Sequence, residues 1–263
     1  SFFNILYSSY FDHYLNIDSY LITLVVSLIF GVIFYFISKN AEKNIKFYEQ
    51  LILIFLIYLF ISLLISIPYY FSYYHLSFID SFFEAISGIT TTGFTVFSNI
   101  KVLDPTLVIW RSSSHWIGGF YFLIFLILIF SNFKSEYKLT HLVYNPDRAI
   151  NIFKDNQKII TKIFFLYSGL TGLIFILFSF SGIRLFNSFN LAMSVSSAGA
   201  FLPTNELSEI IKFSSQKIIL IMAITFSTLN IYFFYSLFVN TNTIKKHYED
   251  IAILILAIFF SLI

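Results

Sequence analysis

The chain has 263 residues, of which 58% are hydrophobic and only 11% are charged. Soluble domains carry about 25% charged residues, so this composition excludes an ordinary water-facing surface and indicates a protein of the lipid bilayer. The absence of cysteine excludes disulfides and thiolate metal sites, and a net charge of +2 does not suggest a nucleic-acid partner.

Apolar runs long enough to cross a bilayer recur along the chain. A spanning helix needs about 20 apolar residues. Five runs reach or approach this length, and a sixth begins near residue 251; the five lie at 19–38, 48–68, 107–132, 159–181 and 214–239. Strand-type alternation is absent, so we predict an all-α integral membrane protein. Because the chain starts at Ser1 and stops inside an apolar run, we expect it to continue at both ends.

Basic residues concentrate on alternate connections between these runs. Eleven of the sixteen lysines and arginines lie in three segments, 39–47, 133–162 and 240–250. Cytoplasmic loops carry an excess of Lys and Arg, so we expect these segments on the cytoplasmic side. The N-terminal stretch, which has Asp12 and Asp18 but no basic residue, then lies outside.

Two other connections, 69–106 and 182–213, are weakly charged and fall on the outer side. Each contains a short helical stretch, SFIDSFFEAISGI or FNSFNLAMSV, followed at once by small residues, TTTGF or SSAGAF. A spanning helix, a short re-entrant helix, a small-residue loop and a second spanning helix thus occur twice, about 106 residues apart. Internal repeats of this kind are typical of transport proteins.

The sequences of the two loops can be aligned in two registers. Placing Gly93 over Gly199 aligns TTTG with SSAG, whereas a slip of one residue matches Gly93 with Ala200 and Phe94 with Phe201. The sequence leaves both registers open.

Each loop has the composition of an ion-selectivity filter. Non-helical backbone at membrane depth must be buried in protein or line a water-filled cavity. The carbonyl end of a re-entrant helix favours a cation there, and the following carbonyls can replace an ion's hydration shell. Gly93 permits the positive φ that such a loop requires. The alternative is a small-residue patch where two spanning helices pack closely, but two copies at equivalent places favour a pore.

The run FFEAISGITTTGFTVF, followed by IWRSSSHWIGGF, resembles the first repeat of the Trk/Ktr/HKT superfamily of potassium transporters, and it looks most like the TrkH branch. The run FNSFNLAMSVSSAGAFLP resembles the second repeat. The resemblance covers nearly the whole chain. It implies helix–pore loop–helix units around a pore, two of an expected four being present here.

The resemblance also implies five divisions of the chain: an outer stretch with an extra helix and a basic loop, a first repeat, a cytoplasmic linker, a second repeat and the start of a third. Their expected bounds are 1–46, 47–135, 136–156, 157–243 and 244–263.

The resemblance implies that loop backbone coordinates the ion, with Thr91, Thr92 and Gly93 central in the first loop and Ser197, Ala198 and Gly199 central in the second. The full set of ion-binding positions is Thr90, Thr91, Thr92, Gly93, Phe94, Ser197, Ala198, Gly199 and Ala200. Family members usually carry threonine and two glycines at 198–200, and Ala200 is the larger departure because it restricts φ. Sodium-preferring plant relatives have serine at the position of Gly93, so glycine implies potassium.

Charged residues near the first loop have two interpretations each. Glu84 can add negative field to the ion path or hydrogen-bond loop backbone, and we favour the second because a buried carboxylate needs partners. Arg111 can tune cation entry or extend to the membrane interface beside Trp110, and we favour the second. Asp80 is expected to help cap its helix, and His115 to serve packing rather than proton relay.

We therefore predict a multi-pass protein of a bacterial inner membrane that takes up potassium, with no enzymatic activity and no organic cofactor. The resemblance implies a homodimer with a cytoplasmic nucleotide-binding regulatory subunit, and the membrane-embedded surface contacts lipid. The alternatives are a sodium-dependent or sodium-permeable member of the same superfamily, an intramembrane enzyme and a structural subunit. An enzyme would need carboxylates or histidines converging in the spanning segments, which hold almost none.

Overall fold

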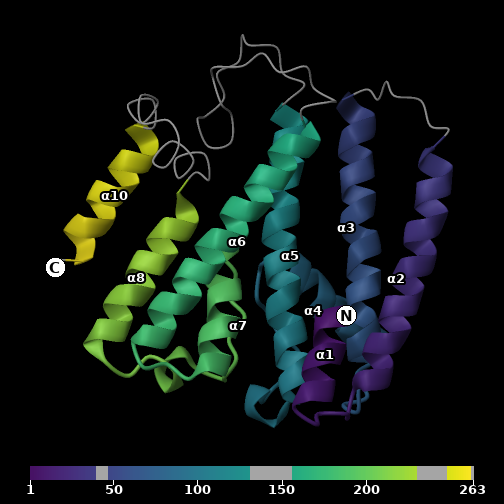
Figure 1. The fold of residues 1–263 in the computed structure, drawn as a ribbon, viewed down its shortest axis with the longest axis horizontal. Helices are drawn as coiled ribbons and strands as arrows, with labels where there is room; N and C mark the ends of the chain where they lie inside the picture. The colour runs from purple at the N-terminus through teal and green to yellow at the C-terminus, as the bar shows by residue number, and fades with distance from the viewer. Residues whose placement is uncertain (40–46, 131–155, 230–247, 262–263) are drawn as a thin grey trace. The chain divides into compact units, whose positions relative to one another are not determined.

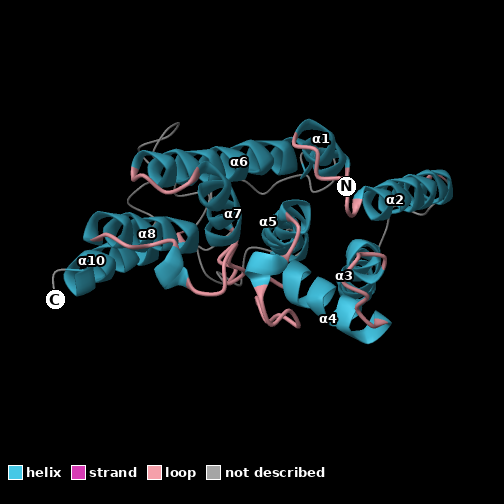
Figure 2. Ribbon diagram, turned by 90° about the horizontal axis from the view of Figure 1, so that it is seen from below, coloured by secondary structure: helices cyan, strands magenta, loops and turns pink. Residues whose placement is uncertain are grey.

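The computed structural model describes residues 1–39, 47–130, 156–229 and 248–261, and the regular elements in these ranges are all helices (Figures 1 and 2). The predicted all-α class is confirmed. By its internal contacts the chain divides into unit 1, Ser1–Gly118 with Gly199–Glu206, and unit 2, Gly119–Ala198 with Leu207–Ile263.

Unit 1 is built on two long apolar helices, α2 and α3, that pack side by side (Figure 1). The short helix α1 packs on α2. The helix α4 packs against α3, as Figure 2 shows. In chain order the elements are α1 Phe2–Tyr10, α2 Ile17–Ser38, α3 Phe47–Tyr70, α4 Phe78–Ile89, the 3₁₀ helix η1 Ile100–Val102 and the first half of α5 Pro105–Phe130. The segment 199–206, which holds the end of the second loop and the residues after it, also belongs to this unit.

Unit 2 contains a second short helix, α7, which packs against both α6 and α8, and α10 packs on α8. Its elements are the second half of α5, α6 Asn156–Phe180, α7 Leu185–Ser196, the 3₁₀ helix η2 Leu207–Glu209, α8 Ser214–Thr228 and α10 Tyr248–Ser261.

Three helices in the described ranges are long and apolar enough to cross a membrane: Ile17–Ser38, Tyr48–Tyr70 and Ile160–Phe180. They correspond to the runs predicted at 19–38, 48–68 and 159–181. The runs predicted at 107–132 and 214–239 continue past the described residues. The basic segments and the linker 136–156 lie largely outside those residues, so their sidedness stays a prediction.

The helix α4 begins where its sequence provides a cap. Ser77 precedes the helix, and its Oγ accepts a hydrogen bond from the Asp80 backbone N–H at 3.1 Å and donates one to the Asp80 carboxylate at 2.7 Å. Asp80 also places negative charge on the first turn, where the helix dipole favours it. Asp80 thus has the predicted role, as the partner of the capping serine.

The buried face of α4 is made mostly of small and polar residues, which lets other backbone approach it. Its members are Ser81, Glu84, Ala85, Ser87, Gly88 and Ile89. At the end of this face, a Cβ added to Gly118 of α5 would collide with the Ile89 carbonyl oxygen. Because Gly118 has no side chain, α5 can approach the end of α4 this closely.

Hydrogen bonds to three helices hold the start of α5. Asn4 of α1 donates to the Thr106 carbonyl at 2.8 Å, and Tyr20 of α2 donates to the Thr106 hydroxyl at 3.1 Å. One turn later the Trp110 indole N–H donates to the carbonyl of Ile65 in α3 at 3.0 Å. These bonds fix the rotation of α5, and therefore which residues it directs at α4.

The Ser77 cap can be tested by Ser77→Ala. We expect a loss of about 1 kcal/mol of stability, because the first turn of α4 loses a side-chain acceptor for a backbone N–H. The measurement is thermal or denaturant unfolding in detergent. Ser38→Ala is the control, since the Ser38 hydroxyl bonds a carbonyl of its own exposed helix end. Equal effects of the two substitutions would contradict the capping role.

Candidate functional site

The loop after α4 has a backbone that no regular helix could adopt. The helix ends at the cap residue Thr90, and Thr91 and Gly93 then take positive φ values of 58° and 84°. Positive φ at Gly93 was predicted, and it is confirmed. Positive φ at Thr91 was not predicted, because a β-branched residue rarely adopts this conformation.

The peptide N–H groups of this loop bond back to the end of α4. Thr91 N–H donates to the Gly88 carbonyl at 3.0 Å, and Thr92 and Gly93 N–H both donate to the Ser87 carbonyl, at 3.0 and 3.3 Å. In a trans peptide the N–H and the preceding C=O point in opposite directions. The carbonyls of residues 90, 91 and 92 therefore point away from the end of α4.

The threonine hydroxyls brace the loop. Thr90 Oγ1 donates to the Ile86 carbonyl at 2.7 Å and lies 2.8 Å from Thr92 Oγ1. A pair of hydroxyls tied to each other and to the helix restricts the side chains of both residues.

Gly93 lies directly against Ala200 of the second loop. A Cβ added at Gly93 would lie 2.5 Å from Ala200 Cβ and 2.8 Å from two of the Ala200 backbone atoms. Glycine is required at 93 for two independent reasons, its φ and this contact.

The end of α7 repeats the geometry of the end of α4. Both helices have 12 residues, and their cap residues have nearly the same conformation, φ −83°, ψ 2° at Thr90 and φ −91°, ψ 4° at Ser197. The next residue takes positive φ in both, 58° at Thr91 and 53° at Ala198. This decides between the two registers, because Thr91 corresponds to Ala198.

The matching register places Thr92 over Gly199, Gly93 over Ala200 and Phe94 over Phe201. The register that aligned Gly93 with Gly199 is wrong. It would place the cap residue of α7 at Ser196, whereas that cap residue is Ser197. The strained alanine is Ala198, in the left-handed region, rather than Ala200. Ser197 and Ala198 belong to unit 2, and Gly199 and Ala200 belong to unit 1.

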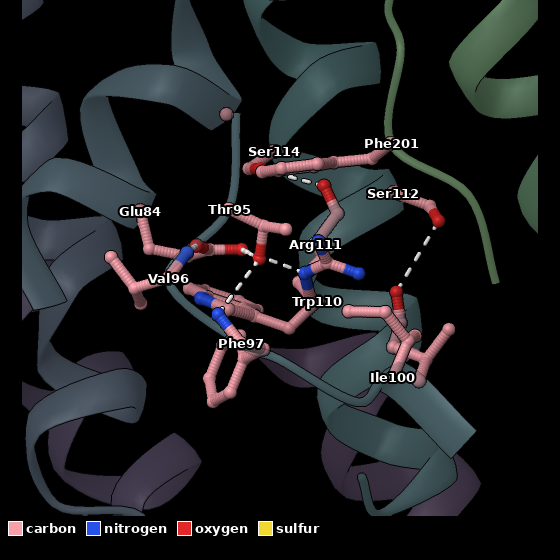
Figure 3. A network of polar contacts seen from close by, with 12 residues as sticks. Glu84, Thr95, Val96, Phe97, Ile100, Trp110, Arg111, Ser112, Ser114 and Phe201 are labelled. Carbon is pink, nitrogen blue, oxygen red and sulfur yellow. Dashed lines mark hydrogen bonds and ion pairs between the residues drawn. The ribbon is translucent and has the colours of Figure 1, made fainter. Parts of the chain in front are cut away.

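A buried ion pair lies beside Thr95 and Val96, which follow the first loop (Figure 3). Arg111 Nε donates to Glu84 Oε1 at 2.8 Å, and the two side chains are only 2% and 0% exposed. The prediction that Arg111 extends to the membrane interface is wrong, because Glu84, one helix away and 27 residues earlier, provides a buried counter-charge.

Glu84 also holds the backbone that leaves the first loop, as predicted. The Thr95 hydroxyl donates to Oε1 at 3.0 Å, and the Val96 N–H donates to Oε2 at 2.9 Å (Figure 3). Three donors on one carboxylate satisfy most of its acceptor capacity, which a buried charge requires.

Arg111 continues this network to residues 201 and 202. Its Nη1 donates to the Leu202 carbonyl at 3.3 Å, and its guanidinium carbon lies 4.1 Å from the centre of the Phe201 ring. It also lies 5.8 Å from the centre of the Phe97 ring. One arginine thus contacts α4 and the segments that follow both loops.

His115 is buried one turn further along α5. Its Nδ1 lies 2.8 Å from the Gly88 carbonyl oxygen, and its Nε2 accepts from the Phe201 N–H at 3.1 Å. The ring stacks on the Phe201 ring, with centroids 4.1 Å apart and planes inclined by 9°. The histidine was expected to serve packing, and it also uses both ring nitrogens.

Unit 1 thus contains three features of a candidate site. The carbonyls of residues 90–92 point away from the end of α4, the charges of Glu84 and Arg111 are paired, and Ala200 of the second loop lies beside the first loop. The sequence did not indicate that Thr95, Phe201 and Asn205 help to hold the loop segments. The side-chain oxygen of Asn205 accepts a hydrogen bond from the Ile100 N–H at 2.7 Å. One sequence signal was available. Arg111 and His115 are four residues apart, which places both side chains on the same face of one helix. Ion binding at the loop positions stays a prediction.

No family model matches the chain. It is 28% identical over 195 residues to an uncharacterized cation transporter of Methanocaldococcus jannaschii, covering 73% of this chain and 40% of that protein. It is 26% identical over 187 residues to the Trk system potassium uptake protein TrkG of Escherichia coli, covering 67% of this chain and 37% of that protein. With TrkH of Salmonella typhimurium it shares 25% identity over 108 residues, 41% of this chain and 22% of that protein.

The fold is similar to the crystal structure of the potassium transporter TrkH from Vibrio parahaemolyticus, with a TM-score of 0.74 at 18% identity. That match covers 93% of this chain and 50% of the solved one, so the chain spans half or less of these proteins. The relationship predicted from the TTTGF and WRSSSHWIGG motifs is confirmed. The named relatives are transporters, in agreement with the prediction that the chain is not an enzyme.

The buried pair can be tested by Glu84→Gln. We expect a loss of about 3–5 kcal/mol in unfolding free energy, because Arg111 becomes an unpaired buried charge. Arg111→Met in the Glu84→Gln background should recover part of this loss, since it removes the unpaired charge. The measurement is chemical unfolding in detergent, with Asp18→Asn, an exposed carboxylate on α2, as the control. A loss no larger than that of the control would contradict the pairing.

Proposed function

We propose, on the premise that the chain is a member of the Trk-type transporter superfamily, that it forms part of the membrane subunit of a potassium uptake system. Potassium is the transported substrate. Each ion sheds its water at a ring of backbone carbonyls, so no covalent step or organic cofactor is needed.

The observation that carries this proposal is the direction of the loop carbonyls. Because three N–H groups, those of Thr91, Thr92 and Gly93, bond back to α4, the carbonyls of residues 90–92 remain available on the opposite side. None of the hydrogen bonds within the described part of the chain ends on these three oxygens. Oxygens in a series, held by a braced backbone, are the ligands that a dehydrated potassium ion requires.

The second loop supplies the corresponding ligands from another repeat. In the register set by the helix ends, residues 197–200 take the positions of residues 90–93. We propose the first and second repeats at 47–135 and 157–243, with two further repeats outside this chain completing the ring. Four repeats are needed because two loops provide only part of a coordination shell.

The paired state of Glu84 and Arg111 indicates how selectivity arises. Because the two charges neutralise each other at 2.8 Å, neither acts as a fixed charge on the ion path. The attraction for a cation then comes from carbonyl dipoles and from the C-terminal ends of the short helices. The pair serves the loops as a brace.

The cellular setting follows from the same premise. We propose a multi-pass protein in the inner membrane of a bacterium that assembles as a homodimer. A cytoplasmic nucleotide-binding regulatory subunit would contact its basic cytoplasmic segments around residues 133–158.

The proposal is tested by growth at limiting potassium. The recipient is a bacterium without potassium uptake systems of its own, supplied with the full-length protein and its regulatory subunit. Rescue together with rubidium or potassium uptake supports the proposal. No rescue, despite verified membrane insertion, would contradict it, and rescue that requires sodium would favour the sodium-dependent alternative.

Within this assay, Gly93→Ser is expected to abolish growth at limiting potassium or to shift uptake toward sodium. A side chain at 93 must adopt a φ of 84°, at a cost of roughly 1–2 kcal/mol, and would press on Ala200. The matched control is Gly182→Ser, because Gly182 has nearly the same φ, 83°, and open space where a Cβ would stand. Equal loss in both variants would mean that backbone strain alone, and not the filter, explains the phenotype.

A further inference from the structure

We propose that Arg111 and His115 form a clamp on α5 that sets the position of the segment Gly199–Leu202 against the first loop, and that His115 is a positioning residue for ion selectivity. The inference rests on the proposed transport function and assigns a role to the IWRSSSHWIGGF motif. All of its contacts lie within unit 1.

The two side chains hold one aromatic ring between them. Residues four apart on a helix lie on the same face, and here the Arg111 guanidinium and the His115 ring each lie 4.1 Å from the centre of the Phe201 ring. Phe201 is 1% exposed. The corresponding phenylalanine after the first loop, Phe94, is 68% exposed, so burial is specific to the clamped one.

The same two side chains also bind the backbone on either side of that ring. The Phe201 N–H donates to His115 Nε2 at 3.1 Å, and the Leu202 carbonyl accepts from Arg111 Nη1 at 3.3 Å. The segment from Gly199 to Leu202 belongs to no helix, so it has no hydrogen-bond ladder of its own. Its position depends on partners of this kind.

His115 joins this segment to the first loop through a single carbonyl. Because Nε2 accepts from Phe201, the proton of the neutral ring lies on Nδ1, which donates to the Gly88 carbonyl at 2.8 Å. That carbonyl also accepts from the N–H of Thr91, the residue with positive φ in the first loop. A shift of the imidazole therefore moves backbone in both loops.

Gly199 makes room for the ring. A Cβ added at Gly199 would collide with the His115 ring, with two ring atoms at 2.8 Å and a third closer. Gly199 has no positive φ, unlike its neighbour Ala198. Its lack of a side chain thus permits the approach of His115, a reason for glycine that is independent of backbone conformation.

If His115 only filled space, an apolar side chain of similar size could replace it. The imidazole, however, donates one hydrogen bond to the Gly88 carbonyl and accepts one from the Phe201 N–H. Selectivity depends on the number and placement of oxygen ligands. Loss of the two bonds frees the second loop relative to the first, and the discrimination between potassium and sodium should then fall.

The experiment compares potassium and sodium uptake by the full-length protein in vesicles of known protein content. His115→Phe keeps the stacking on Phe201 but removes both hydrogen bonds. His115→Gln retains one donor and one acceptor. Ser112→Ala is the matched control, because it removes a buried hydrogen bond on the same helix, from the Ser112 hydroxyl to the Val108 carbonyl at 3.3 Å, that does not reach a loop.

We expect His115→Phe to lower the potassium-to-sodium uptake ratio about tenfold, toward the lower end of what two lost hydrogen bonds of ordinary strength would cost. His115→Gln should keep the ratio close to that of the parent, and Ser112→Ala should leave it unchanged. A parental ratio in His115→Phe would overturn the inference. If His115→Phe does not insert, a parental ratio in Phe201→Leu would overturn it.

A second measurement does not depend on transport. We expect the falls in melting temperature caused by His115→Phe and Phe201→Leu to be less than additive in the double variant, because both substitutions release the same segment. Strict additivity would overturn the clamp. If the parent takes up no potassium, the proposed function fails, and this cycle still decides whether the clamp exists.

Discussion

The structure of unit 1 depends on the buried pair between Glu84 and Arg111. Burying two charges is costly unless each is matched and hydrogen-bonded, and here the carboxylate accepts from the Arg111 guanidinium, the Thr95 hydroxyl and the Val96 N–H. The same guanidinium reaches the Leu202 carbonyl. Because each charge must keep these partners, the pair holds α4, α5 and the backbone after both loops in one arrangement.

In this arrangement the loop backbone and the side chains have different roles. The end of α4 accepts the loop N–H groups, and this turns the loop carbonyls the other way. Those carbonyls are left to bind an ion, so side chains must fix the loops in space. Arg111 and His115 do so from one face of α5, whose rotation is in turn fixed by Asn4, Tyr20 and Trp110 through bonds to neighbouring elements.

Much of the fold and part of the site could be predicted from the sequence. Apolar runs of about 20 residues indicate spanning helices without any knowledge of their neighbours, and TTTGF after a short helix was enough to predict positive φ at Gly93. The register of the second loop was not predictable. Aligning glycine with glycine is the natural choice, yet Gly199 is a glycine because His115 approaches it, and the strained position is Ala198. The predicted position of Arg111 was wrong for a similar reason, because its partner Glu84 lies on a separate helix.

The sequence by itself determined the class of protein, the extent of most helices and the chemical character of the loops. These depend on composition and on local backbone preferences, which are properties of a short stretch of chain. Only the tertiary structure decided which charges are paired, which loop residues correspond and which side chains hold the loops. Those depend on contacts between residues far apart in the chain, such as Phe201 with His115, 86 positions earlier, and no local pattern encodes such a distance.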